Sequence, residues 1–470
     1  MRKTLATGAG ALLLALMTSA APAQTVAITG GTVALGDGSD PIEGGTVVIR
    51  NGRIVAAGRG VAVPAGAQTV DATGKWVTPG IFAGFSRVGL AEVDAVDAAN
   101  DVRANNSPFS AAIDVAPAIN PRAAAISISR AAGVTRAVVA PATARSIFAG
   151  QGAVIDLGAD MQPITWARAF QFVEFGETGA SEAGGSRAAT FALFRNALRE
   201  ARDVGRRQGI SGGTDSQRLP RASDQREFPL EEVPDPNSPL LGSDVNRPQD
   251  VLLTRFDAAA LVPVLTGRQL LLVHVERASD ILQVLGLRRE FPNLRMVLVG
   301  ATEGWTVAEQ IRASGVPVIA NALVDLPASF EQLAATQSNF GRMRAAGISV
   351  AMGTINEDET RMVRVTRQNA GNLVALTKVP GASGLSWGEA LAAITSRPAE
   401  VLGLGGEIGS LRPGRRADVV VWDGDPLDTL SVPQMVMIDG VQQPLDTRQT
   451  KLRDRYLRPG EQGMPKAYER

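Results

Sequence analysis

Cysteine is missing from all 470 residues, and histidine occurs once, at His274. Without cysteine the chain can form no disulfide and can offer no thiolate as a metal ligand or a nucleophile. A chain of this length can still bury enough apolar surface to fold without cross-links. Any metal site would have to supplement one imidazole with carboxylates.

A net charge is also lacking, because 47 basic residues balance 47 acidic ones. No overall field therefore favours nucleic acid or an anionic membrane as a partner. Beyond the N-terminus, no apolar run is long enough to cross a bilayer. Apolar residues make up 45% of the chain and charged residues 20%, which is ordinary for a globular protein.

The chain begins "MRKTLATGAGALLLALMTSAAPAQ". A basic start at Arg2 and Lys3 precedes an apolar run, and residues 21–23 offer a small-x-small cleavage site. This order is typical of a secretory signal peptide, with a buried N-terminal helix as the alternative reading. We expect residues 1–23 to be removed and the mature protein to be periplasmic or secreted.

Two kinds of pattern divide the rest of the chain. Residues 24–78 and 400–446 alternate apolar and polar positions around glycine turns, which predicts antiparallel strands joined into one composite β-sandwich. Residues 79–399 instead contain short apolar runs, such as "QLLLVHV" and "RMVLVGA", separated by helical patterns. Such runs indicate strands buried on both faces of a parallel sheet. The pattern predicts an α/β fold whose main domain is a (β/α)₈ TIM barrel.

Two segments lack these strand and helix patterns. Residues 211–250 are rich in Pro, Ser, Asp and Arg, and they predict a long mobile excursion that is either a solvated loop or a lid over the barrel mouth. Residues 447–470 form a charged tail, which we expect to attach loosely.

A specific resemblance rests on the stretch "SWGEALAAITSRPAEVLGLGGEIGSLRPGRRADVVVWDGDPL", residues 386–427. Ser386 and Glu389 predict a capping box that starts a helix, and glycine turns then lead into a strand. This ordered set resembles the C-terminal hallmark of the amidohydrolase superfamily. Four further stretches resemble its imidazolonepropionase- and prolidase-like branch: "AINPRAAAISISRAAGVTRAVVAP", "IFAGQGAVIDLG", "VHVERASDI" and "ATEGWTVAEQI".

The resemblance implies a metal-bearing barrel with a composite β-sandwich, and hydrolysis of carbon–nitrogen bonds in non-peptide or dipeptide-like amides. It also implies a zinc site, most of whose ligands this chain replaces. The first barrel strand of the family ends His-x-His, and Phe85 and Arg87 hold these places. His274 matches the fifth-strand histidine, Gly300 the sixth-strand histidine and Ile355 the eighth-strand aspartate. We therefore expect no resident metal, because zinc needs ligands that these side chains lack.

His274, Glu276 and Glu303 are the candidate catalytic residues, because they lie near predicted strand ends, where barrel enzymes carry their chemistry. His274 could be a metal-free general base, a ligand-binding group or a member of a satisfied hydrogen-bond network. With Glu357 and Asp358, the two glutamates could instead supply a magnesium or calcium site.

Arg87, Gln151 and Trp305 are the candidate ligand-binding residues. Arg87 either fills the volume left by the metal and pairs with Glu276 or Glu303, or reaches solvent. Gln151 lies in a segment that matches a family loop near the barrel mouth, with a glycine turn between strands as the alternative. Trp305 is either a substrate platform or a packing residue at a helix start.

These observations predict an exported amidohydrolase-like protein with a degenerate metal site and weak or no metal-dependent hydrolysis. Its partner would be a small amide-type substrate or ligand, without nucleic acid and without a membrane. The alternatives are an enzyme of altered chemistry, a small-ligand-binding protein and a non-catalytic subunit beside an intact amidohydrolase relative. The chain could form a homo-oligomer, or a hetero-oligomer with such a relative, and the hypothesis of a non-catalytic subunit requires the hetero-oligomer.

Overall fold

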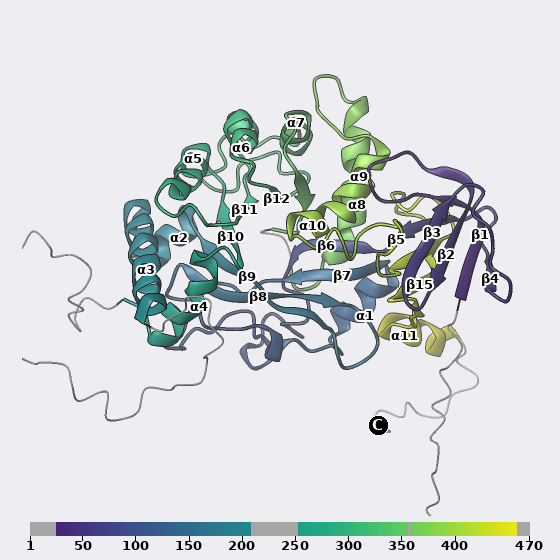
Figure 1. Ribbon diagram of the computed structural model, residues 1–470, viewed down its shortest axis with the longest axis horizontal. Helices are drawn as coiled ribbons and strands as arrows, with labels where there is room; N and C mark the ends of the chain where they lie inside the picture. The colour runs from purple at the N-terminus through teal and green to yellow at the C-terminus, as the bar shows by residue number, and fades with distance from the viewer. Residues whose placement is uncertain (1–24, 208–251, 356–358, 458–470) are drawn as a thin grey trace, which may run out of the picture.

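The computed structural model describes residues 25–207, 252–355 and 359–457. Two eight-stranded sheets dominate, one built from both ends of the described chain and one from its middle (Figure 1). The predicted signal peptide and the predicted excursion at 211–250 lie outside the described residues, as do Glu357 and Asp358. Within the described ranges, no helix is both long and apolar enough to span a membrane.

The first sheet joins segments that are far apart in the sequence. Its strands follow the order β16-β15-β14-β5-β1-β2-β3, and β4 pairs with β1. Antiparallel pairing of β14 with β5 links the C-terminal segment to the N-terminal one, which confirms the predicted union of the two ends as one mixed sheet. The strands are β1 (Thr25–Val33), β2 (Ile42–Arg50), β3 (Arg53–Gly58), β4 (Gln68–Asp71), β5 (Trp76–Pro79), β14 (Val419–Trp422), β15 (Pro433–Ile438) and β16 (Val441–Gln442).

The second sheet is the barrel, and its strands run in chain order from β6 to β13. The Thr354 amide and hydroxyl both donate to the Phe85 carbonyl oxygen, at 3.2 and 2.9 Å, so the ring is nearly closed. The strands are β6 (Ile81–Ser86), β7 (Val134–Val139), β8 (Phe148–Asp156), β9 (Ile164–Glu174), β10 (Leu270–Val275), β11 (Met296–Gly300), β12 (Val318–Ala320) and β13 (Val350–Met352).

The predicted barrel is confirmed with one difference in strand direction. Strand β8 runs antiparallel to both β7 and β9, so these three strands form a meander. Their connections span only residues 140–147 and 157–163. A parallel crossover needs a dozen or more residues, so these connections can only turn the chain back.

Alternation along the barrel strands divides their side chains between the barrel interior and its outer face. Phe82, Phe170, Phe172 and Leu272 are buried in one apolar cluster that fills the interior, and Ala399 of helix α10 joins it. The remaining barrel helices pack outside the strands (Figure 1). The helices are α1 (Ala124–Ala131), α2 (Gly176–Glu182), α3 (Arg187–Arg207), α4 (Arg255–Leu265), α5 (Ala278–Gly286), α6 (Ala308–Ser314), α7 (Asn339–Ala345), α8 (Thr366–Ala375), α9 (Trp387–Ala393), α10 (Ser396–Val401) and α11 (Arg448–Leu457).

The charged tail, which was expected to attach loosely, begins with a helix. The ten residues of the tail that follow Thr447 form α11. The Thr447 hydroxyl accepts the Thr450 amide at 3.1 Å and caps the first turn. The helix lies beside α1 of the barrel (Figure 1). Residues 458–470 lie outside the described ranges.

A buried arginine on β7 ties the barrel to the terminal sheet. The Arg136 guanidinium donates to both carboxylate oxygens of Asp418, at 2.8 and 3.0 Å, and to Asp439 at 2.8 Å. Asp156 lies 3.6 Å from the same side chain, which is 1% exposed. Burial alone would lower the pKa of Arg136, but the three carboxylates outweigh it and raise that pKa. The cluster therefore joins β7 to the residues next to β14 and β15.

Replacing Arg136 with Ala should destabilise the protein by about 3–5 kcal/mol, because it leaves Asp418 buried without its charge partner. The measurement is the free energy of unfolding from urea denaturation. Arg453→Ala is the matched control, since Arg453 pairs with Asp454 at the surface, where both side chains are more than 60% exposed. The control should change stability by less than about 1 kcal/mol, and equal losses in the two variants would contradict this role of Arg136.

Candidate functional site

The candidate site lies where three neighbouring barrel strands end. Strand β9 ends at Glu174, β10 at Val275 and β11 at Gly300. His274 on β10 stands opposite Glu174 in the β9–β10 register. Because parallel strands expose their carboxyl ends at one mouth of a barrel, these side chains meet there.

His274 is held between two carboxylates. Its Nδ1 lies 2.5 Å from Glu174 Oε2, and its Nε2 lies 3.1 Å from Glu276 Oε1. A neutral imidazole carries one N–H, whereas two carboxylate partners each require a donor. The geometry therefore favours the doubly protonated imidazolium.

The electrostatics of this group agree with its geometry. Burial by itself would lower the pKa of His274, but the charge and hydrogen bonds of Glu174, followed by those of Glu276, raise that pKa well above its ordinary value of 6.5. Burial would raise the pKa of Glu276, yet the bonds from His274 and the Thr302 amide lower it. The imidazolium and the Glu276 carboxylate thus stabilise each other's charged form.

Glu276 also explains why position 300 is a glycine. Its second oxygen accepts the Thr302 amide at 2.8 Å, which folds its carboxylate against the backbone of Gly300. Gly300 has φ +90°, and a Cβ atom there would lie 2.5 Å from Glu276 Oε1. A histidine at this position would need the space that Glu276 fills.

Arg87 is buried at the mouth, but with a different partner from the predicted ones. Its Nε donates to Glu359 Oε2 at 2.6 Å, and its guanidinium carbon lies 5.7 Å from the centre of the Phe85 ring. The predicted pairing with Glu276 or Glu303 is wrong, because those carboxylates are engaged by His274 and by backbone amides. The alternative of a solvent-directed Arg87 is wrong too, since its side chain is only 10% exposed.

Glu303 lies close to Glu276 but faces the loops around the site. Its two oxygens accept the amides of Ala278 and Ala334, at 2.9 and 3.0 Å. Both oxygens are therefore used to fix the start of α5 and the loop before α7. Glu303 positions these loops, and the structure does not bring it together with His274.

Two of the positions matched to metal ligands belong to the apolar interior. Phe85 packs on Phe172 with ring centres 5.3 Å apart, and Ile355 lies in the same buried cluster. The Ile355 backbone is held on both sides by the Asn321 amide, which accepts from its N–H at 2.8 Å and donates to its carbonyl oxygen. Neither side chain offers a donor atom to a cation.

These observations allow a direct test of whether the residues fit zinc. His274 uses both ring nitrogens, Arg87 is cationic, and Glu276 occupies the space next to Gly300. In the described ranges, no three His, Cys, Asp or Glu side chains are placed to hold a metal ion together. The described donor set therefore does not fit the zinc that the resemblance implies.

A cavity of about 490 Å³ opens at this mouth. Glu174, Arg87 and Glu359 line it together with the polar side chains of Asn100 and Thr143. With Arg103, Asp94 and Glu182, its wall presents two cations and four carboxylates, besides threonine hydroxyls and an amide. This wall can bind a small polar molecule, and Glu174 connects it to the imidazolium below.

The other two candidate ligand-binding residues lie away from this cavity. Gln151 sits within strand β8, so both the predicted loop and the predicted turn are wrong. It stands opposite Gln171 on the outer face of the barrel, where the Gln269 amide donates to it at 3.2 Å. The Trp305 indole donates to the Ala334 carbonyl at 2.8 Å and packs under Arg342, at 4.3 Å, as a packing residue would.

Sequence reasoning missed Glu174 and Glu359. Glu174 directly follows the apolar run of β9, the strand-end position that singled out Glu276, so the same signal could have found it. Glu359 ends the acidic run "NEDE", in which Glu357 and Asp358 were the residues considered. Only the fold places Glu359 against Arg87, which is 272 residues away in the chain.

Comparison with known proteins agrees with this architecture. Residues 301–442 match the amidohydrolase family. The chain is 34% identical over 124 residues to the imidazolonepropionase of Acidiphilium cryptum, which covers 26% of this chain and 29% of that protein. It is 47% identical over 60 residues to the amidohydrolase tasK of Hapsidospora irregularis, or 13% of this chain and 6% of that protein. The chain thus spans less than a third of either curated relative.

The solved structure of an amidohydrolase from Thermotoga maritima has the same fold, with a TM-score of 0.71 and 23% identity over 89% of this chain and 99% of that one. The chain is thus similar to the amidohydrolase family over residues 301–442, and it shares the fold of a solved amidohydrolase.

His274 should remain doubly protonated through neutral pH, where an ordinary imidazole with a pKa of about 6.5 is mostly neutral. Because it is the only histidine, its ring signals are unambiguous in protein that carries no histidine tag. The measurement is a pH titration of the ¹⁵N-labelled imidazole by NMR. In Glu174→Gln the midpoint should fall, since one of the two stabilising charges is gone. A wild-type midpoint near 6.5 would contradict the imidazolium.

The pKa shifts of His274 and Glu276 limit the stability of the cluster at opposite ends of the pH range. His274 has a raised pKa, so its stabilisation is complete below 6.5 and is lost as pH rises through the raised value. Glu276 has a lowered pKa, so its stabilisation is present above 4.5 and is lost as pH falls through the lowered value. The cluster is therefore most stabilising between these limits.

Proposed function

We propose that this chain is an exported member of the amidohydrolase superfamily, descended from hydrolases of carbon–nitrogen bonds, in which an ion-pair cluster stands in place of the catalytic metal. Zinc-dependent amide hydrolysis is then weak or absent. The mouth retains a polar cavity for a small ligand, an amide-type molecule by family resemblance. Export rests on the signal-like N-terminus, which is a property of the sequence.

The observation that carries this proposal is the saturation of His274 by two glutamates. A metal-ligating histidine presents a neutral ring nitrogen to the cation. Here both nitrogens face carboxylates, at 2.5 and 3.1 Å. Metal binding would have to remove a proton from an imidazolium whose pKa the same carboxylates raise, which opposes ligation.

The charge balance of the mouth supports the same proposal. Catalytic zinc supplies positive charge that lowers the pKa of a bound water and polarises a carbonyl. In this chain the imidazolium neutralises one of its two carboxylates, and Arg87 neutralises Glu359. Protein cations thus occupy the electrostatic role of the metal, but neither can deliver a water nucleophile as a metal does.

Purified mature protein without a tag should hold well below one zinc per chain after incubation with Zn²⁺ and desalting. The measurement is metal content by inductively coupled plasma mass spectrometry, with a parallel assay of zinc-stimulated hydrolysis on cyclic amides and N-acyl amino acids. His274→Gln is the matched variant, and it should hold the same background amount of metal as the wild type.

One result would overturn the proposal. If the wild type binds near-stoichiometric zinc and His274→Gln loses it, then His274 is a metal ligand and the imidazolium is displaced on binding. Zinc-dependent turnover that disappears in the same variant would have the same meaning. Saturable binding of a small amide by the wild type without turnover would support the ligand-binding role of the cavity.

A further inference from the structure

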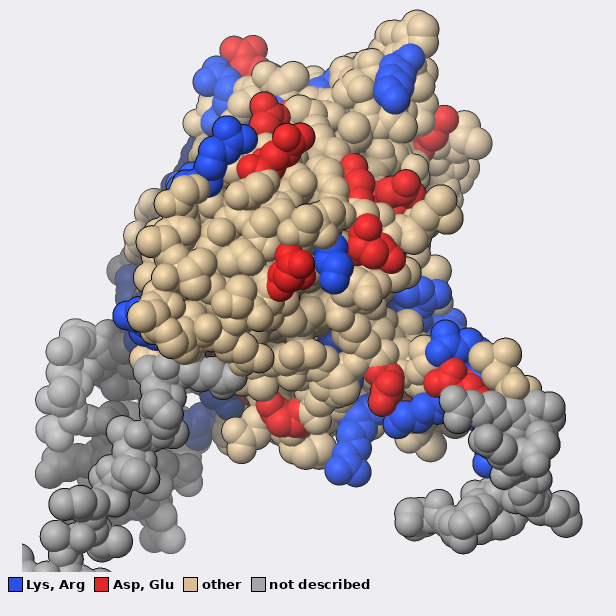
Figure 2. Space-filling view, turned by 90° about the vertical axis from the view of Figure 1, so that its right-hand side faces the viewer, with Lys and Arg blue, Asp and Glu red and all other residues tan. Residues whose placement is uncertain are grey.

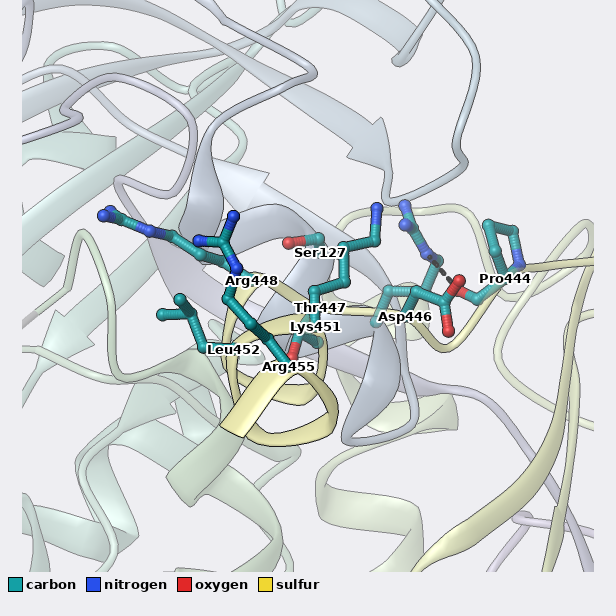
Figure 3. A pocket seen from close by; sticks show the side chains of 9 residues that line it. Ser127, Pro444, Asp446, Thr447, Arg448, Lys451, Leu452 and Arg455 are labelled. Atoms are coloured by element: carbon teal, nitrogen blue, oxygen red, sulfur yellow. Dashed lines mark hydrogen bonds between the residues drawn. The ribbon is translucent and has the colours of Figure 1, made fainter. Parts of the chain in front are cut away.

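A second cavity, remote from the barrel mouth, lies between α1 and α11. It has a volume of about 660 Å³ and is lined by both helices and by the segment that leads into α11 (Figure 3). Four of its lining residues are basic: Arg130 on α1, and Arg448, Lys451 and Arg455 on α11. Among the described residues that line it, Asp446 is the single acidic one.

Arg130 forms the floor of this cavity and is only 5% exposed. Its guanidinium donates to two backbone carbonyl oxygens, those of Pro444 at 3.1 Å and Leu157 at 2.8 Å. Burial lowers its pKa, and no charged group among the described residues offsets that effect. Arg130 therefore differs from buried Arg136, which three carboxylates surround. A buried cation without a counter-charge favours an anion in the adjoining space.

Helix α11 adds three like charges to the same cavity. Arg448, Lys451 and Arg455 are spaced at i, i+3 and i+7, so they share one face of the helix. Figure 3 shows their side chains extending toward α1, beside the Ser127 side chain. Like charges at this spacing repel, and Arg448 also lies in the first turn, at the positive end of the helix dipole. Arg448 and Lys451 therefore weaken the first turn of the helix unless an anion offsets their charge.

The basic lining of the cavity stands out from a chain that has no net charge. On the face shown in Figure 2, Lys and Arg side chains near the lower margin lie among Asp and Glu side chains, and both signs also occur higher on this face. The excess of basic side chains is therefore a property of the cavity lining. It attracts anions at short range, within about a Debye length of the surface.

We propose that the cavity between α1 and α11 binds a phosphate group, either free or as part of a phosphate ester. Arg130, Arg448 and Lys451 outnumber the one carboxylate, Asp446, by two, which calls for a ligand with more than one negative charge. A phosphate carries about −1.5 to −2 at neutral pH. Guanidinium groups match phosphate oxygens in pairs, and the Ser127 hydroxyl can donate a further bond. This site is independent of the barrel mouth and of its chemistry.

The test is isothermal titration of the tag-free protein with inorganic phosphate at low ionic strength. The wild type should bind saturably, and Arg448→Ala/Lys451→Ala should weaken binding about tenfold or more. Both positions are exposed and alanine favours helix, so the variant should fold. The matched control, Arg59→Ala/Arg453→Ala, removes the same charge from exposed residues that do not line the cavity, and it should bind as the wild type does.

A second arm distinguishes the source of the phosphate. Sedimentation with phosphatidylcholine vesicles, with and without phosphatidic acid, tests a lipid headgroup. Saturable binding of inorganic phosphate assigns a soluble ligand, and binding only to the phosphatidic acid vesicles, lost in Arg448→Ala/Lys451→Ala, assigns a headgroup. Both support a phosphate site. Binding to neither, or equal weakening in the two double variants, would overturn it.

Discussion

One imidazolium between two carboxylates holds the mouth of this barrel together. Glu174 ends β9, His274 lies on β10, and Glu276 reaches the Thr302 amide just after β11. Three neighbouring strands are thus joined by charged hydrogen bonds in a buried setting, where such bonds are strong and an unpaired charge is costly. Removing His274 would leave two buried carboxylates without their counter-charge. The geometry of the surrounding loops depends on this cluster.

The rest of the mouth is arranged around the same constraint. Glu276 occupies the space above Gly300, so position 300 must lack a side chain. Phe85 and Ile355 extend the apolar interior up to the level of the charged cluster. Arg87 then covers Phe85 and pairs with Glu359 at the cavity wall. Aromatic packing and ion pairs together stabilise a mouth whose described side chains do not suit zinc.

Two arginines outside the barrel mouth, Arg136 and Arg130, are also buried, and their surroundings differ. Arg136 is surrounded by carboxylates, and it links the barrel to the sheet made by both chain ends. Arg130 is buried against backbone oxygens only, beneath the basic face of α11. In the first arrangement the cation is fully compensated by protein carboxylates, and it therefore acts in architecture. The second keeps a net positive charge next to a cavity, which is the property expected of an anion site.

Much of the fold could be predicted because it depends on local patterns. The run "QLLLVHV" becomes β10, and Ser386 caps α9 by accepting the Glu389 amide, as the capping box predicted. The antiparallel β8 was not predicted, because the direction of a buried strand leaves no mark on its apolar pattern. His274 and Glu276 lie two residues apart on one strand, so their proximity followed from the sequence.

The sequence by itself determined the class of fold, the union of the two chain ends and the end of the barrel at which the polar residues gather. Tertiary structure alone decided the protonation state of His274, the partner of Arg87 and the outward position of Gln151. The physical reason is that ionisation depends on burial and on neighbouring charges. Those neighbours come from distant strands: Glu174 is 100 residues from His274, and Glu359 is 272 residues from Arg87.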